Sequence, residues 1–199
     1  MSQTASSTNS AHQPGGRHNA DCLQLQGTDC REQSENRQAC IDTLDLYRAA
    51  VDFFIALVLK RWDSVFVKEM PEQKQIKAME QLCIRTKNRP DTPYDFSEKF
   101  YKFPSYLRRA AIRHAYGQVS SYMAHLETWT KNRHGNPPGL PRAGRVFPPL
   151  YHKNMFVRDK INGLYSARIK VFIRNTWDWM EVRLRKSDVD YLERYQNAP

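Results

Sequence analysis

The segment FPSYLRRAAIRHAYG, from Phe103 to Gly117, carries three arginines at helical spacing. Arg108, Arg109 and Arg113 are one and four residues apart, so an α-helix would gather them on one side. No Asp or Glu occurs between Phe100 and Glu127, whereas solvated helix faces usually mix both signs of charge. The pattern therefore favours contact with phosphates over an ordinary solvated face.

The same helix and the loop after it add polar and basic candidates. Gln118 and Ser121 carry side chains that can hydrogen-bond base edges, and the loop contributes cations for phosphates. The candidate nucleic-acid contacts are Tyr106, Arg108, Arg109, Arg113, Gln118, Ser121, Arg142, Arg145, Lys153, Lys170, Arg174, Trp177, Trp179 and Arg183.

The last five of these belong to a predicted β-hairpin, ARIKVFIRN followed by WDWMEVRLR. Both runs alternate with the two-residue period of strands, and Asn175-Thr176 is the expected turn. One face is aliphatic, and the other mixes aromatic with basic side chains, a combination that stacks on bases and grips phosphates. For Trp177 and Trp179, packing in the core is an equally good interpretation.

No catalytic or metal-binding constellation stands out. The chain has no Gly-x-Ser-x-Gly, Walker or dinucleotide motif, and its histidines lack metal-ligand spacing. Cys22, Cys30, Cys40 and Cys83 include no Cys-x-x-Cys pair. The acids Asp188, Asp190 and Glu193 read as a helix start. We expect no catalytic residue, metal or cofactor, and no enzymatic activity from this chain.

Charge points to a polyanionic partner. The 199 residues carry a formal net charge of +10, with a pI near 9.6. Residues 101–158 hold ten Lys and Arg against one acid. Such an excess favours nucleic acid first and an anionic membrane second. The free thiols and the lack of an apolar N-terminal run or of a span of about 20 apolar residues indicate a cytoplasmic protein.

Periodicity predicts an α+β protein. Residues 1–40 read as a disordered or weakly structured tail, and residues 41–135 as a helical region. That region would hold a helix capped by Asp42, a second beginning at Pro71 and a third that is capped by Ser105 and runs to about Lys131. Spacings of three and four residues give the first and third helices an apolar face, which on the third includes Tyr122. Residues 136–186 would form a basic loop and the hairpin. Residues 187–199 would begin a helix, with Ser187 and Asp190 in capping-box spacing.

Four ordered segments resemble TnpB-type (OrfB) proteins, RNA-guided DNA nucleases of insertion sequences that are related to type V CRISPR effectors. They are TLDLYRAAVDFFIALVLKRWDSV from Thr43, KFPSYLRRAAIRHAYGQVSSYMAHLETW from Lys102, FPPLYHKNMF from Phe147 and ARIKVFIRNTWDWMEVRLRKSDVDYL from Ala167. The resemblance implies a helical recognition insertion beside a wedge-type β-barrel, which together hold guide RNA and double-stranded target DNA in a bacterial, nucleoid-associated protein.

Two family features are missing from this sequence. The RuvC-like nuclease normally follows the wedge, whereas this chain ends at Pro199, so the expectation is a truncated, nucleic-acid-binding transposase part without catalysis. The first barrel strand should precede Thr43, where DCLQLQ is a weak candidate, so whether the barrel closes stays open. A nuclease-dead repressor and a basic subunit for a separate acidic or nuclease partner are the alternatives.

Overall fold

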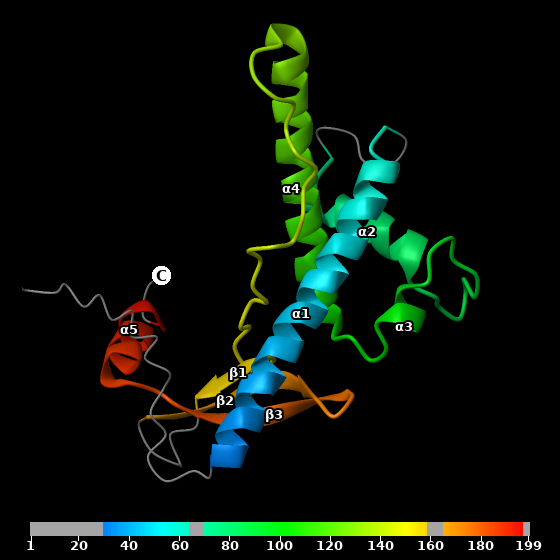
Figure 1. Ribbon diagram of the computed structural model, residues 1–199. Coiled ribbons are helices and arrows are strands. Elements are labelled where there is room, and N and C mark those ends of the chain that lie inside the picture. Colours follow the sequence, from blue (N-terminus) through cyan, green and yellow to red (C-terminus); the bar gives the residue numbers. More distant parts are fainter. Residues whose placement is uncertain (1–29, 64–69, 159–164, 197–199) are drawn as a thin grey trace, which may run out of the picture.

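The computed structural model describes residues 30–63, 70–158 and 165–196, which form an α+β fold (Figure 1). This confirms the predicted α+β class. The elements in chain order are α1 (Cys30–Lys60), α2 (Glu72–Cys83), α3 (Phe96–Lys99), α4 (Ser105–Asn132), β1 (Phe156–Arg158), β2 (Ser166–Ile173), β3 (Thr176–Arg183) and α5 (Lys186–Gln196).

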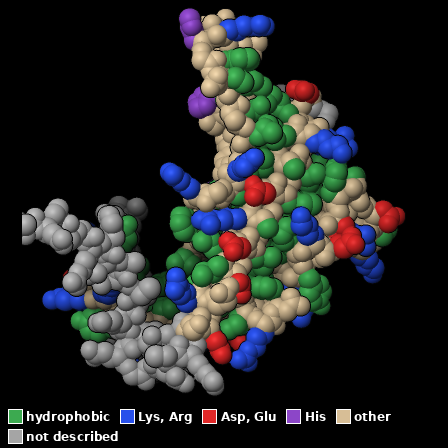
Figure 2. Space-filling model, viewed as in Figure 1, with side chains coloured by type: hydrophobic (Ala, Val, Ile, Leu, Met, Phe, Trp, Pro, Cys, Tyr) green, Lys and Arg blue, Asp and Glu red, His purple; other side chains and the backbone are tan. Residues whose placement is uncertain are grey.

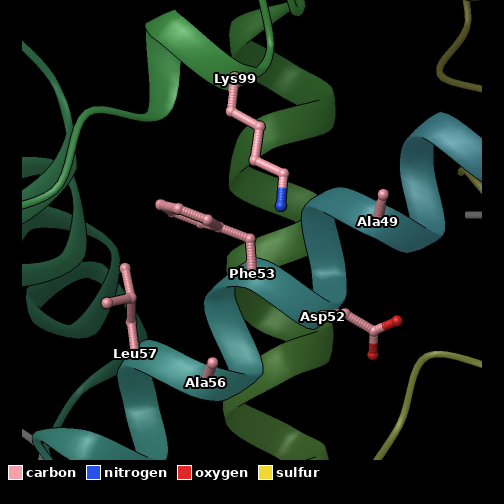
Figure 3. Close-up of a pocket in the computed structure, with 6 residues that line it drawn as sticks. All are labelled: Ala49, Asp52, Phe53, Ala56, Leu57 and Lys99. Carbon is pink, nitrogen blue, oxygen red and sulfur yellow. The ribbon is translucent and has the colours of Figure 1, made fainter.

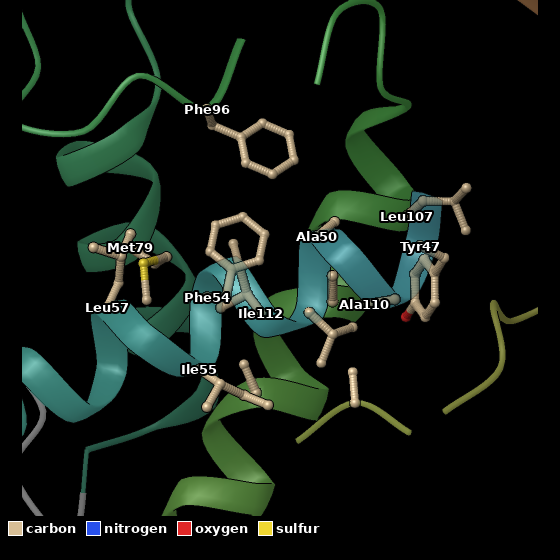
Figure 4. Packing of buried hydrophobic residues seen from close by; sticks show 14 of the residues in the cluster. Tyr47, Ala50, Phe54, Ile55, Leu57, Met79, Phe96, Leu107, Ala110 and Ile112 are labelled. Carbon is tan, nitrogen blue, oxygen red and sulfur yellow. The ribbon is translucent and has the colours of Figure 1, made fainter. Parts of the chain in front are cut away.

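The core lies where α1 packs against α4 (Figure 4). On α1, Tyr47, Phe54 and Val58 recur at helical spacing and are fully buried. The facing stripe of α4 contains Leu107 and several alanines, whose small side chains let the two backbones approach. Met79 of α2 is also fully buried in this cluster. The predicted apolar faces of α1 and the first half of α4 are therefore confirmed.

An aromatic cluster surrounds α3 and joins the helices to the sheet. Phe96 stacks on Phe54 and on Phe100, with ring centroids 4.9 and 4.6 Å apart. Asp95 caps α3, because its carboxylate accepts from the backbone N–H of Ser97 and of Glu98. The sequence pattern predicted no helix at these four residues, since one helical turn has no detectable period.

The second half of α4 projects beyond α1 and α2 (Figure 1). No residue of α4 after Val119 is buried. Residues 133–155, the return segment, run from the end of α4 back along it towards β1. Near the turning point, the indole N–H of Trp129 donates to the carbonyl of Gly135 at 3.1 Å. This half of α4 and the start of the return segment thus form an arm outside the main core, whereas Ala143 and Met155 of the return segment are buried in that core.

The sheet has the strand order β1-β2-β3 and is antiparallel throughout. Ile169 pairs with Met180 and Lys170 pairs with Trp179, which confirms the predicted aliphatic and basic-aromatic faces. Thr43 joins α1 to β2, because its hydroxyl accepts from the N–H of Phe172 at 2.7 Å. Within the described residues the three strands form an open sheet.

The predicted hairpin turn is wrong by one residue. Ile173 pairs with Thr176, so Arg174 and Asn175 make the turn. Both have positive φ, 49° and 61°, as a type I′ turn requires. The error arises because alternation predicts the face on which Ile173 lies but does not predict where strand pairing ends. Ile173 forms the last pair of β2, so the turn begins one residue earlier than predicted.

Three helix starts also differ from the prediction. The first helix begins at Cys30, so Asp42 lies inside it and accepts a hydrogen bond from Gln38; its polar first turns show no apolar period. Ser105 is the first residue of α4 rather than its cap. Asp188 accepts from the N–H of Arg185 at the start of α5, in place of the expected capping box. The strand candidate DCLQLQ lies outside the described residues.

Candidate nucleic-acid interface

The predicted arginine cluster on α4 forms ion pairs with α2. Arg108 and Arg109 both contact Oε1 of Glu80, at 3.0 and 3.3 Å. Arg113 pairs with Glu72 and also donates to the hydroxyl of Tyr151 at 3.3 Å. The stretch that lacks acids in sequence therefore meets two acids in space, because α2 packs beside α4.

These pairs assign the cluster a structural role. The side chain of Arg108 is only 16% exposed, so its charge is held by Glu80 rather than offered to solvent. Arg109 and Arg113 are more accessible, at 56% and 45%. Ion pairs of such exposed groups are weak in water. The two outer guanidinium groups therefore keep accessible surface, while Arg108 does not.

The return segment is held in place from α1 and α4. The carboxylate of Asp52 accepts from the backbone N–H of Ala143 at 2.8 Å. Arg48 donates to the carbonyl of Val146 at 3.2 Å, and its guanidinium lies over the ring of Phe147. Further along, the hydroxyl of the predicted contact residue Tyr106 donates to the carbonyl of Asn154 at 3.0 Å. These contacts give an irregular segment a defined position.

The return segment presents exposed cations. Arg142, Arg145 and Lys153 are exposed, and none forms an ion pair with a described residue. No Asp or Glu occurs from Thr128 to Arg158. Exposed apolar side chains lie on the same segment: Leu140, Phe147 and Leu150. The combination of exposed cations with an exposed aromatic ring, that of Phe147, is typical of surfaces that bind nucleic acid.

A groove between α4 and the return segment, the α4 groove, brings three predicted residues together. Gln118 and Ser121 of α4 line it opposite Arg142. Its volume is about 410 Å³. The other lining residues are Gly117, Tyr122, His125, Pro138, Gly139 and Pro141. Sequence reasoning placed Tyr122 on the buried face and missed His125; their position one helical turn after Gln118 and Ser121 was the available signal.

The structure separates the hairpin candidates from the α4 group. Trp177 contacts Phe103 and Phe172 at centroid distances of 5.7 Å and packs against the core, which decides between its two interpretations. Trp179 is half-buried, with the ammonium of Lys170 5.5 Å from its ring centroid. Arg174 lies in the turn, 3.8 Å from Glu35, and Arg183 is exposed on β3.

The chain belongs to the Aq_aa04 family. The family model matches residues 26–173. The chain is 27% identical over 161 residues to "Uncharacterized protein aq_aa04" of Aquifex aeolicus (strain VF5), an alignment that covers 70% of this chain and 89% of that protein. No solved structure matches. The region shared with the Aq_aa04 family contains all of α4 and the return segment, whereas β3 and α5 lie beyond it.

A second groove, lined by residues of α1 and by Lys99 of α3, is mainly apolar (Figure 3). Ala49, Phe53, Ala56 and Leu57 form its apolar floor, and its volume is about 490 Å³. Lys99 extends from α3 beside Phe53 in Figure 3. The floor offers no converging hydrogen-bond donors, so this groove is a poor phosphate site.

His114 lies beside the arginine cluster and contacts α1. Its Nδ1 is 3.1 Å from the hydroxyl of Tyr47. Desolvation, followed by the nearby charge of Arg113, lowers the pKa of His114 below the ordinary value of 6.5. Burial raises the pKa of Tyr47. The described residues contain no group of three His, Cys, Asp or Glu that could hold a metal ion.

The face of the molecule on which α1 lies in front carries mixed charge. Figure 2 shows Lys and Arg interspersed with Asp and Glu on the face where α1 lies in front, and His side chains at the projecting end of α4. None of the described helices is long and apolar enough to cross a membrane. This mixed-charge face therefore differs from the return segment, whose sequence contains no Asp or Glu.

Proposed function

We propose that this protein binds nucleic acid through the face formed by α4 and the return segment. The observation that carries the proposal is the set of three exposed cations, Arg142, Arg145 and Lys153, on a segment without carboxylates. Asp52 and Arg48 of α1 hold this segment, so the cations start from a defined arrangement. Preorganised cations bind a phosphate backbone at a lower entropic cost than mobile ones.

Each part of the face has a chemical task. The three cations neutralise phosphates and release their counterions. Gln118 and Ser121 in the α4 groove donate and accept hydrogen bonds. Phe147 is 66% exposed and offers a ring for base stacking, with Arg48 on its face.

The resemblance to TnpB-type proteins suggests which nucleic acids to test. In that interpretation α4 belongs to a recognition insertion, and the sheet contributes to a wedge-type barrel. The ligands would be a structured guide RNA and duplex DNA, and this chain would bind them without cutting. RNA that co-purifies with the protein from its natural host would support this narrower proposal, and its absence there would count against it.

The test compares two triple variants of equal charge. Arg142→Gln/Arg145→Gln/Lys153→Gln removes the proposed contacts, and Lys74→Gln/Lys77→Gln/Lys87→Gln removes three exposed lysines of α2 and the following loop. Fluorescence anisotropy with labelled RNA, single-stranded DNA and duplex DNA over a salt series gives the affinity. We expect the first triple to reduce the salt slope by about three and the second to leave it nearly unchanged.

Two outcomes would overturn the proposal. One is an equal loss of affinity in both triple variants, which would show that only net charge matters. The other is the absence of binding by the natural chain to all three nucleic acids at low salt. Circular dichroism of both variants keeps a loss of folding distinct from a loss of contact.

A further inference from the structure

Gly117 lies in the interior of α4, where glycine has no packing or conformational reason to be. A Cβ built at this position meets no heavy atom within 4 Å. Its φ is not in the left-handed region that favours glycine. Glycine in a helix interior is less stable than alanine by about 1 kcal/mol. The folded chain alone therefore gains nothing from the missing side chain.

The open space beside Gly117 is the α4 groove. Gly139 of the return segment lines the same groove, and a Cβ there also meets nothing within 4 Å. Gly117 and Gly139, on opposite walls, thus expose backbone without a side chain to the same groove. A bare backbone is the usual arrangement where a ligand approaches the chain closely.

The polar lining of the groove is suited to an anion. Arg142 supplies a guanidinium, and Gln118 and Ser121 supply further donors. None of the nine lining residues is Asp or Glu. A guanidinium with neighbouring hydroxyl and amide donors is chemistry that recognises phosphate. A cation would find no carboxylate in the groove, and an apolar ligand would leave Arg142 desolvated.

The remaining lining is suited to a ring. Tyr122 on α4 and Pro138 and Pro141 on the return segment form apolar walls. The volume of about 410 Å³ lies within the range of small-ligand sites. A phosphate group and a planar ring occur together in a nucleotide.

We propose that the α4 groove is a nucleotide subsite of the nucleic-acid interface. The phosphate lies against the α4 backbone at Gly117, held by Arg142, Gln118 and Ser121, and the base packs on Tyr122. This inference rests on the proposed function and adds to it: the return segment contacts the strand along its length, and one nucleotide enters the groove. Gly117 is bare because a Cβ would occupy the place of the phosphate.

The decisive variant is Gly117→Ala, because stability and binding move in opposite directions. We expect a higher melting temperature than the natural chain, since alanine favours the helix. We also expect about fivefold or greater weakening of a fluorescein-labelled 12-nucleotide single strand. Arg142→Gln should weaken the same probe, while Arg37→Gln, an exposed α1 residue of equal charge, should change affinity less than twofold. Unchanged strand affinity in Gly117→Ala would overturn the subsite.

Amide chemical shifts separate the possible ligands and the two proposals. Saturable shifts of the Gly117 and Gly139 amides with the 12-nucleotide strand or with 5′-AMP support the subsite. If 5′-AMP shifts these amides and the strand does not, the ligand is a free nucleotide. Equal shifts with inorganic phosphate would overturn the role given to Tyr122. Strand binding without any shift at these glycines would remove the subsite and leave the proposed function standing.

Discussion

The guanidinium of Arg108 donates to the carboxylate of Glu80 at 3.0 Å, although 28 residues separate them in the chain. Arg109 contacts the same oxygen. One carboxylate on α2 thus serves two adjacent arginines on α4, at a site where Arg108 and Glu80 are both largely buried. The pair links α2 to α4 and holds the charge of Arg108 against Glu80, while the side chain of Arg109 stays 56% exposed.

Replacing Glu80 by Gln should destabilise the fold by about 1–3 kcal/mol, because Arg108 would keep its charge in a partly buried place without a carboxylate. Chemical denaturation measures the change. Glu72→Gln is the matched control: its pair with Arg113 is exposed, so the expected loss is below about 1 kcal/mol. Equal effects at the two positions would contradict the different roles assigned to them.

The hairpin turn predicts a stabilising change. Arg174 holds a positive φ of 49° that asparagine adopts more easily. Arg174→Asn should therefore raise stability by about 0.5–1 kcal/mol. Asn175→Ala should lower the stability by a similar amount, since alanine adopts the φ of 61° at that position only at a higher energy than asparagine. Thermal melts of the two variants check the pair, and a shift in the same direction for both would be inconsistent with a type I′ turn.

Replacing each of the two tryptophans of β3 by alanine should lower the stability of the fold by different amounts. Trp177→Ala should cost about 2–4 kcal/mol, because the ring packs between Phe103 and Phe172. Trp179→Ala should cost clearly less, since Trp179 is not part of the hydrophobic core and the cations of Arg168 and Lys170 lie over its ring. Urea denaturation gives both values. A larger loss at Trp179 would show that the core extends to the other end of the hairpin.

Stability should fall on mild acidification because of His114. Its pKa is lowered in the folded state, so the unfolded chain binds more protons below about pH 6.5. The contribution of His114 is complete above that pH and is lost as the pH falls from there towards the folded pKa. Unfolding free energies between pH 7.5 and 5 measure this loss. His114→Gln should flatten that part of the profile, and an unchanged slope would remove His114 as its cause.

The spacing of apolar residues in the sequence was enough to predict those helices and strands in which the spacing is regular. The α+β class, the extent of α4 and the two faces of the hairpin follow from spacings of three, four or two residues, and the structure confirms them. The early start of α1 was missed because its first turns are polar. Helix α3 was missed because it is a single turn.

Tertiary structure decided which predicted residues share a site. Three contacts join residues that are far apart in sequence. They are the ion pair of Arg108 with Glu80, the ring contact of Trp177 with Phe103 and the hydrogen bond from Ala143 to Asp52. Periodicity reports which side of an element is apolar, but it cannot report which element packs against that side. The basic return segment has no period, so the sequence alone could not place it. The burial of Ala143 in the core and the hydrogen bonds to α1 and α4 bring Arg142 beside Gln118 and Gly117.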